Sequence, residues 1–268
     1  IEQWVRSPPG LPTGLLPPRF KLLKCIYGHP LANQRFQAHN DTILRGIGFK
    51  PIISSPSVYV LNKDGEQMIL GIVTDDFIMA HRFQSPLKQF VLDEISKHYT
   101  ITMRDPLESF VGLHISRDFE SRTITLRQPN FIQSMSEKYH LPPEKSFPST
   151  PMAPSSQLRT AEDTLLSQDL LSPSRKTLFR SVIGDISWVG FHTRPDILYA
   201  VNMLARRAQN PNEYDFKQAL RVAHYIIGTS SLGLVLGSQN GLHLIATVDT
   251  SYATHDDMKS HSSWSVFM

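Results

Sequence analysis

Two adjacent aspartates, Asp75 and Asp76, are the residues of this sequence whose type and spacing best suit chemistry. They lie in MILGIVTDDFIMA (residues 68–80), between two apolar runs that are typical of β-strands. Aspartate favours tight turns, where a solvated pair needs no further role. A carboxylate pair at the tip of a rigid hairpin also suits a divalent cation, because Mg²⁺ takes carboxylate oxygens and completes its shell with water and phosphates. The spacing alone leaves both interpretations open.

The segments around this pair predict an α+β fold. The run NKDG (residues 62–65) between β-rich segments predicts a hairpin, so that residues 57–80 form an antiparallel ribbon with the carboxylates at one tip. Apolar spacing predicts a helix over residues 35–49 that stops at Gly46 or Gly48, and a second helix capped by Ser85. A further hairpin is expected to turn at residues 118–122, followed by a short helix over residues 129–141.

A Pro/Ser-rich segment at residues 142–157 predicts a linker, and helical patterns follow it. Helices are expected over residues 175–193, 194–209 and 212–230, the last with an apolar stripe and a stop at Gly228; the stripe consists of Phe216, Leu220, Ala223 and Ile227. Residues 232–253 then predict a hairpin that turns at QNG (residues 239–241) and leads to Asp249. Trp188 and Trp264 occupy apolar-periodic positions, which places them in the predicted core.

Composition limits the class of protein. The chain has 268 residues, of which 40% are hydrophobic and 19% charged, enough for one large or two ordinary packed domains. The net charge of +3 and the pI of about 9.0 are compatible with a nucleic-acid partner without requiring one. The single cysteine, Cys25, excludes an internal disulfide and fits a reducing compartment. No apolar run reaches the length of a membrane span and no signal peptide is visible, so we expect an intracellular protein without a membrane partner.

Other charged residues invite a functional interpretation. His192, Thr193, Arg194 and Asp196 are catalytic residue types, but TRPD is better explained as a helix N-terminus, with Thr193 as its cap and Asp196 favouring the helix dipole. Arg206 and Arg207 either contact a nucleic-acid backbone or form a solvated helix face.

The order of the segments resembles the reverse transcriptase of copia-type (Pseudoviridae) LTR retrotransposons. VTDD (residues 73–76) stands where that family has its Y-V-D-D box, and KLLKCIYG (residues 21–28) resembles its K-L-x-K-x-L-Y-G run. FRSVIGDISWVGFHTRPDILYAVNMLARRAQNP (residues 179–211) is similar to Y-R-x-x-I-G-x-L-x-Y-L-x-x-x-T-R-P-D-I-x-x-A-V-x-x-L-S-R-x-x-x-x-P. TVDTSYA (residues 247–253) looks like the opening of its RNase H domain. The resemblance runs in order along essentially the whole chain.

The resemblance implies a right-hand polymerase that copies RNA into DNA. Residues 1–128 would be part of the fingers and palm, residues 129–235 the thumb and connection, and residues 236–268 the first strands of an RNase H-like domain. Asp75 and Asp76 would be catalytic and bind Mg²⁺ or Mn²⁺, with a primer-template and dNTP as partners. Asp249 would be the first RNase H carboxylate. The family also implies virus-like particles in the cytoplasm, or a nuclear location.

Departures from the family pattern concern activity. The family carries a third catalytic carboxylate in D-V-x-x-A-F-L-N-G, which this chain lacks, and its box tyrosine is Val73 here. The usual glutamine and arginine of the next segment are Leu31 and Gln34, with Arg35 displaced by one position as a candidate nucleic-acid contact. We therefore expect a reverse transcriptase fragment that is inactive alone, with the third carboxylate on an upstream segment or a second polyprotein chain. The alternative is a non-catalytic remnant that at most binds nucleic acid.

Overall fold

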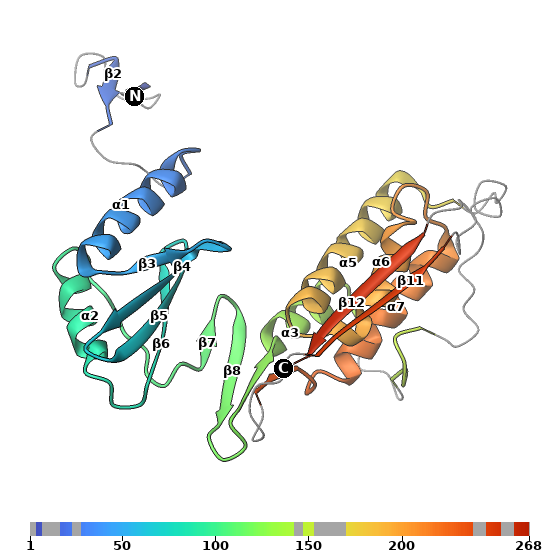
Figure 1. Ribbon diagram of the computed structural model, residues 1–268. Helices are drawn as coiled ribbons and strands as arrows, with labels where there is room; N and C mark the ends of the chain where they lie inside the picture. Colours follow the sequence, from blue (N-terminus) through green and yellow to red (C-terminus); the bar gives the residue numbers. More distant parts are fainter. Residues whose placement is uncertain are drawn as a thin grey trace. The chain divides into compact units, whose positions relative to one another are not determined.

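The computed structural model describes residues 4–6, 17–22, 28–141, 147–152, 170–237, 245–252 and 260–267. The chain has two units, Ile1–Met103 and Arg104–Met268, whose helices and strands Figure 1 labels. Each unit has a hydrophobic core of its own. Helices and antiparallel sheets occur in both units, which confirms the predicted α+β class.

A four-stranded antiparallel sheet organises the first unit. Its order is β3-β4-β5-β6, and its strands are β3 (Lys50–Ile52), β4 (Ser55–Lys63), β5 (Glu66–Val73) and β6 (Asp76–His81). The hairpin predicted from NKDG is confirmed, because Lys63 pairs with Glu66 across a turn made of Asp64 and Gly65. The φ angles of these turn residues are 52° and 78°, and aspartate and glycine tolerate that region better than most residues. Two short strands, β1 (Trp4–Arg6) and β2 (Arg19–Lys21), pair separately.

Helices α1 (Ala32–Ile47) and α2 (Leu87–Ser96) cover one face of this sheet. The core that they form with alternate residues of β4 and β5 consists of Leu44, Phe49, Tyr59, Leu61, Met68, Leu70, Leu87, Val91 and Ile95. Gly48 ends α1 with φ of 111°, as one of the two predicted stops, while the helix begins at Ala32, before the expected Arg35. The Oγ of Ser85 accepts a hydrogen bond from the Leu87 N–H (3.3 Å) at the start of α2.

The second unit contains another four-stranded sheet, in the order β10-β9-β8-β7. Its strands are β7 (Ser109–Phe110), β8 (Leu113–Asp118), β9 (Thr123–Arg127) and β10 (Leu234–Leu236), and the β8–β9 hairpin confirms the turn predicted at residues 118–122. The hairpin predicted over residues 232–253 is wrong, because β10 pairs with β9. Strands β11 (Ile245–Ser251) and β12 (His261–Phe267) pair with each other instead. The QNG turn lies outside the described residues.

Glycines explain why β10 joins a strand that is distant in sequence. Gly233 and Gly237 bracket β10, and a Cβ at either position would collide with the backbone oxygen of Leu126 or Arg122. The absence of a side chain lets the two backbones approach. Local strand signals cannot reveal such a long-range pairing.

Helices form the larger core of the second unit. They are α3 (Pro129–Lys138), α5 (Pro173–His192), the 3₁₀ helix η1 (Pro195–Ile197), α6 (Leu198–Ala205) and α7 (Glu213–Gly228), so the predicted helical segments are confirmed. Helix α7 ends at Gly228 as predicted, but its buried face is rotated from the predicted stripe. Leu220 and Ile227 are only partly buried, whereas Val222 and Ile226 are fully buried.

The division between the two compact units falls after Met103. The boundary between palm and thumb expected after Gln128 stays a prediction. The pairing of β9 with β10 ties the β8–β9 hairpin to the chain that follows α7. Within the predicted linker, only residues 147–152 are described. No helix in the described ranges combines the length and apolar character that crossing a bilayer requires.

The prediction that Trp188 and Trp264 are core residues is wrong. Trp188 is 42% exposed and Trp264 is 76% exposed. The indole of Trp188 lies on the outer side of α5, and Trp264 lies in the two-stranded β11–β12 ribbon, where no second layer of the described structure buries it.

Candidate active site

The two aspartates lie at the predicted hairpin tip. Val73, the last residue of β5, pairs with Asp76, the first residue of β6, so Thr74 and Asp75 form the connecting turn. Both carboxylate-bearing residues are exposed. The tip position is therefore confirmed, while metal binding by these carboxylates stays a prediction.

The strand register sets the direction of Asp76. Cross-strand partners share a face of the sheet, and Phe77 and Met79 of β6 pack on the core beneath α1 and α2. Asp76 and its partner Val73 alternate with those residues, so they belong to the opposite face, which the helices leave open. A ligand at Asp76 would approach from that open face.

Packing below the tip holds the hairpin in place. Met68 and Leu70 of β5 have no exposed surface and interdigitate with residues of both helices. Thr74 adopts φ of 55°, a conformation that is uncommon for a β-branched residue. Such strain persists only where the surrounding structure imposes it, and it is enriched at functional sites.

The donor set at the tip is consistent with Mg²⁺ but small. Mg²⁺ is commonly held by one or two carboxylates together with waters and substrate phosphates, which matches an exposed pair of aspartates. In the part of the chain that the structure describes, no group of three or more His, Cys, Asp or Glu side chains could hold a metal ion. The outer edge of β6 is unpaired among the described strands, so a further strand could add beside Asp76.

The remaining predicted site residues are distributed over both units. Arg35 is an exposed residue in the first turn of α1, in the unit that carries the aspartates. Arg206 is the exposed C-cap of α6, and Arg207 follows it, partly buried. Asp249 is an exposed residue of β11 opposite Ser263. Cys25 lies outside the described residues.

The TRPD segment forms a polar cluster around the buried Arg194, and the prediction that Thr193 caps a helix N-terminus is wrong. Thr193 closes α5, its N–H donating to the Val189 carbonyl oxygen (3.0 Å), while its hydroxyl donates to Gln128 Oε1 (2.7 Å). The following helix, η1, begins only at Pro195, with Arg194 at its N-cap position. The helix start is displaced because α5 continues to His192.

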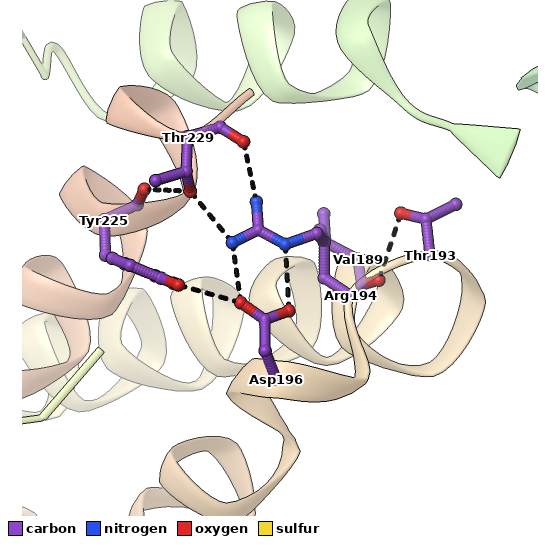
Figure 2. Close-up of polar contacts among 6 residues, drawn as sticks. All are labelled: Val189, Thr193, Arg194, Asp196, Tyr225 and Thr229. Atoms are coloured by element: carbon purple, nitrogen blue, oxygen red, sulfur yellow. Dashed lines mark hydrogen bonds and ion pairs between the residues drawn. The ribbon is translucent and has the colours of Figure 1, made fainter. Parts of the chain in front are cut away.

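Arg194 is the centre of this cluster (Figure 2). Its guanidinium donates to both carboxylate oxygens of Asp196 (2.9 and 2.8 Å) and to the backbone and side-chain oxygens of Thr229 (2.9 and 2.8 Å). The hydroxyl of Tyr225 donates to the same carboxylate (2.9 Å). These bonds join η1 to α7, so Arg194 serves packing and its donors are directed inward.

The charges of the cluster balance each other. The side chain of Arg194 is 2% exposed and that of Asp196 is 40% exposed. Burial by itself would raise the pKa of Asp196, but the hydrogen bonds and charge of Arg194 outweigh burial and hold that pKa below its ordinary value. Sequence reasoning missed this cluster; its one local signal was a cation and a carboxylate two residues apart in an apolar segment.

Comparisons with known proteins identify the family that the hairpin region resembles. The family model of reverse transcriptase (RNA-dependent DNA polymerase) matches residues 1–154, which include Asp75 and Asp76. The Pol polyproteins of the transposons RE1 and RE2 of Arabidopsis thaliana are each 28% identical, over 92% and 100% of this chain. A putative transposon Ty5-1 protein of Saccharomyces cerevisiae is 26% identical over 94% of this chain and 80% of its own length.

The chain spans less than a fifth of the RE1 and RE2 polyproteins, 16% and 18% of their lengths. No solved structure matches the chain. The family match extends over more than half of the sequence and includes the aspartate hairpin, which agrees with the resemblance read from the motifs. The chain therefore belongs to the reverse transcriptase (RNA-dependent DNA polymerase) family, in the form found in retrotransposon Pol polyproteins.

Proposed function

We propose that this chain supplies the aspartate hairpin of an RNA-directed DNA polymerase, in which Asp75 and Asp76 hold Mg²⁺ or Mn²⁺ against the phosphates of an incoming dNTP. The observation that carries this proposal is the exposed carboxylate pair at the tip of a packed hairpin within the region that matches the family. When bound, the metal would polarise the α-phosphate and the primer 3′-hydroxyl. The protein's part is to hold both carboxylates on the open face of the sheet.

The free edge of β6 supports a two-part site. A strand that added to this edge would run beside Asp76 and could contribute the third carboxylate that the polymerase mechanism needs. That strand would come from an upstream segment or from a second polyprotein chain. We therefore expect this chain to bind metal weakly and to extend no primer alone. In the same proposal, residues 1–128 belong to fingers and palm, residues 129–235 to thumb and connection, and residues 236–268 to the start of an RNase H-like domain with Asp249 as its first carboxylate.

Mn²⁺ binding tests the hairpin directly. Electron paramagnetic resonance of Mn²⁺ should show a bound fraction for the unaltered chain that Asp75→Asn and Asp76→Asn each reduce. Asp64→Asn is the matched control, because Asp64 is an exposed aspartate at the other hairpin turn of the same sheet. Equal loss of Mn²⁺ binding in all three variants, or in none, would contradict the assignment.

Primer extension tests the expected inactivity. With Mg²⁺ or Mn²⁺, the unaltered chain and Asp75→Asn should give the same background signal on an RNA template. Extension that disappears in Asp75→Asn would show that this chain alone holds the complete site.

A non-catalytic nucleic-acid binder is the second candidate. It is favoured by the absence of a third metal-ligating side chain near the hairpin among the described residues, and by Leu31 and Gln34 at the altered start of α1. This function predicts salt-dependent binding of a primer-template duplex with no extension and no Mn²⁺ affinity at Asp75. Arg35, Arg206 and Arg207 are the candidate backbone contacts, and their replacement should flatten the salt dependence.

A further inference from the structure

Three aromatic rings gather on the outer side of the second unit. Trp188 and His192 of α5 are one helical turn apart, with ring centroids separated by 3.8 Å and planes inclined by 39°. Phe131, in the first turn of α3, lies beside Trp188 with a centroid separation of 6.4 Å. Two helices that are separate in sequence thus build one aromatic cluster.

The cluster holds an exposed indole in a fixed orientation. Trp188 is 42% exposed, while Phe131 and His192 are partly buried. The imidazole of His192 is itself anchored, because its Nδ1 lies 2.8 Å from the Trp188 carbonyl oxygen and must donate to it. The imidazole covers part of the indole, because the ring centroids are 3.8 Å apart. The Trp188 indole therefore has little rotational freedom to lose when a planar ligand stacks on it.

The charges near the indole do not oppose a polyanion. Asp185 precedes Trp188 by about one turn on α5, but Lys138 donates to its carboxylate at 2.7 Å and Tyr139 donates at 2.6 Å. The first turn of α3, which contains Phe131, has no acidic residue, so the partial positive charge of that helix end is not cancelled locally. The chain as a whole has a net charge of +3.

Small and ion-paired neighbours lie about one turn before Trp188 on α5. Gly184, one turn earlier on α5, presents open space where a Cβ would be, and Asp185 beside it is ion-paired. A stable protein interface needs roughly 800 Å² on each partner. A single fixed ring is instead the size of one nucleobase, and base stacking on aromatic side chains is the usual way in which proteins hold single strands.

We propose that Trp188, held by His192 and Phe131, is a stacking platform for unpaired nucleobases of a template or primer strand. Only the identity of the ligand, a template or primer strand, depends on the proposed polymerase function. It lies in the second unit, whereas the aspartate hairpin lies in the first, so each site can be tested without the other.

The test uses the full chain with Trp188 as its single tryptophan, through Trp4→Phe and Trp264→Phe. This protein is titrated at low salt with oligo(dT) and with an abasic oligonucleotide of the same length and charge. Oligo(dT) should quench the Trp188 fluorescence and bind about tenfold more tightly than the abasic strand, because a tenfold difference lies within the range expected for one stacked base. A blunt duplex of equal length should leave the fluorescence unchanged.

Variants at two positions of α5, with affinity measured by the anisotropy of a dye-labelled oligonucleotide, separate stacking from folding. Trp188→Leu should lower the affinity for oligo(dT) to that for the abasic strand, and Trp188→Phe should restore part of it. Phe191→Leu is the matched control, because Phe191 is 73% exposed on the same helix but is not one of the three clustered rings. It should bind oligo(dT) as the unaltered chain does.

Equal quenching by oligo(dT) and the abasic strand would overturn the platform, as would equal affinity losses in Trp188→Leu and Phe191→Leu. The absence of any Trp188 response would overturn it too. In each case the Mn²⁺ assay at Asp75 still decides the proposed polymerase function by itself. Conversely, base-dependent quenching in a chain that shows no Asp75-dependent Mn²⁺ binding would keep the platform and reject the polymerase assignment.

Discussion

The buried guanidinium of Arg194 depends on one carboxylate, so Asp196→Asn should strongly destabilise the second unit. The asparagine keeps the shape of the side chain but removes the charge and one of the two oxygens that accept from Arg194. Breaking a buried ion pair from one side costs about 3–5 kcal/mol, because the remaining charge stays buried without compensation. The Asp196 side chain is 40% exposed, so water retains part of the interaction and about 3 kcal/mol is the appropriate estimate.

A surface ion pair of similar geometry provides the control. Arg175 and Glu213 are joined at 2.7 Å, but both side chains are 48% exposed. Exposed pairs contribute about 0.2–1 kcal/mol, so Glu213→Gln should change the free energy of unfolding by less than about 1 kcal/mol.

Urea unfolding at pH 7, followed by far-UV circular dichroism, measures both variants. With roughly 2–4 °C for each kcal/mol in a unit of this size, Asp196→Asn should also lower the Tm by about 6–12 °C. The reasoning fails if Asp196→Asn costs no more than Glu213→Gln. The hydrogen bonds to Thr229 alone would then be enough to stabilise the buried guanidinium of Arg194.

Further predictions concern acid stability, core packing and helix capping. Because the pKa of Asp196 is lowered in the folded chain, its carboxylate adds to the free energy of unfolding above the ordinary aspartate value of 3.8, and this contribution is lost as pH falls through the lower folded value. Below pH 4, urea melts should therefore show a smaller fall in the free energy of unfolding for Asp196→Asn than for the unaltered chain. Met68→Ala should lower the free energy of unfolding of the first unit by about 2–5 kcal/mol, because Met68 has no exposed surface. An unchanged urea midpoint would mean that the site collapses without leaving a cavity. Asn212→Ala should cost about 1 kcal/mol, because Asn212 and Asp215 form a reciprocal capping box at the start of α7, and Asp215→Ala should give a similar loss in the same assay.

The two units differ in where their charged side chains lie. The aspartate hairpin stands on a sheet that two helices cover on one face only, which leaves Asp76 open to a ligand. In the second unit, the buried Arg194 instead directs its guanidinium inward, to Asp196 and Thr229. Charged residues that suit catalysis by type therefore differ in burial between the two places: Asp75 and Asp76 are exposed, and Arg194 is buried.

Short-range patterns determined most of the elements. The turn residues Asp64 and Gly65 specify their hairpin by backbone preference, and Gly228 and the other glycine stop, Gly48, end their helices close to the predicted residues. The position of Asp75 and Asp76 at a hairpin tip followed from the same logic, since a polar pair between two apolar runs leaves the chain few alternatives. The family was also readable from the sequence, because its motifs occur in order along the chain.

Only the tertiary structure decided the long-range pairings and the burial of particular side chains. Strand β10 joins β9 because Gly233 and Gly237 permit close approach to a distant backbone, which local propensity does not encode. Arg194 is buried because Thr229 and Asp196 meet it there, while Trp188, although apolar and periodic, faces outward on α5. Periodicity indicates that a helix has a buried face, but the neighbours that pack against the helix select which residues form that face. The sequence by itself therefore determined the elements and the family, and the packing of those elements decided which side chains are available for function.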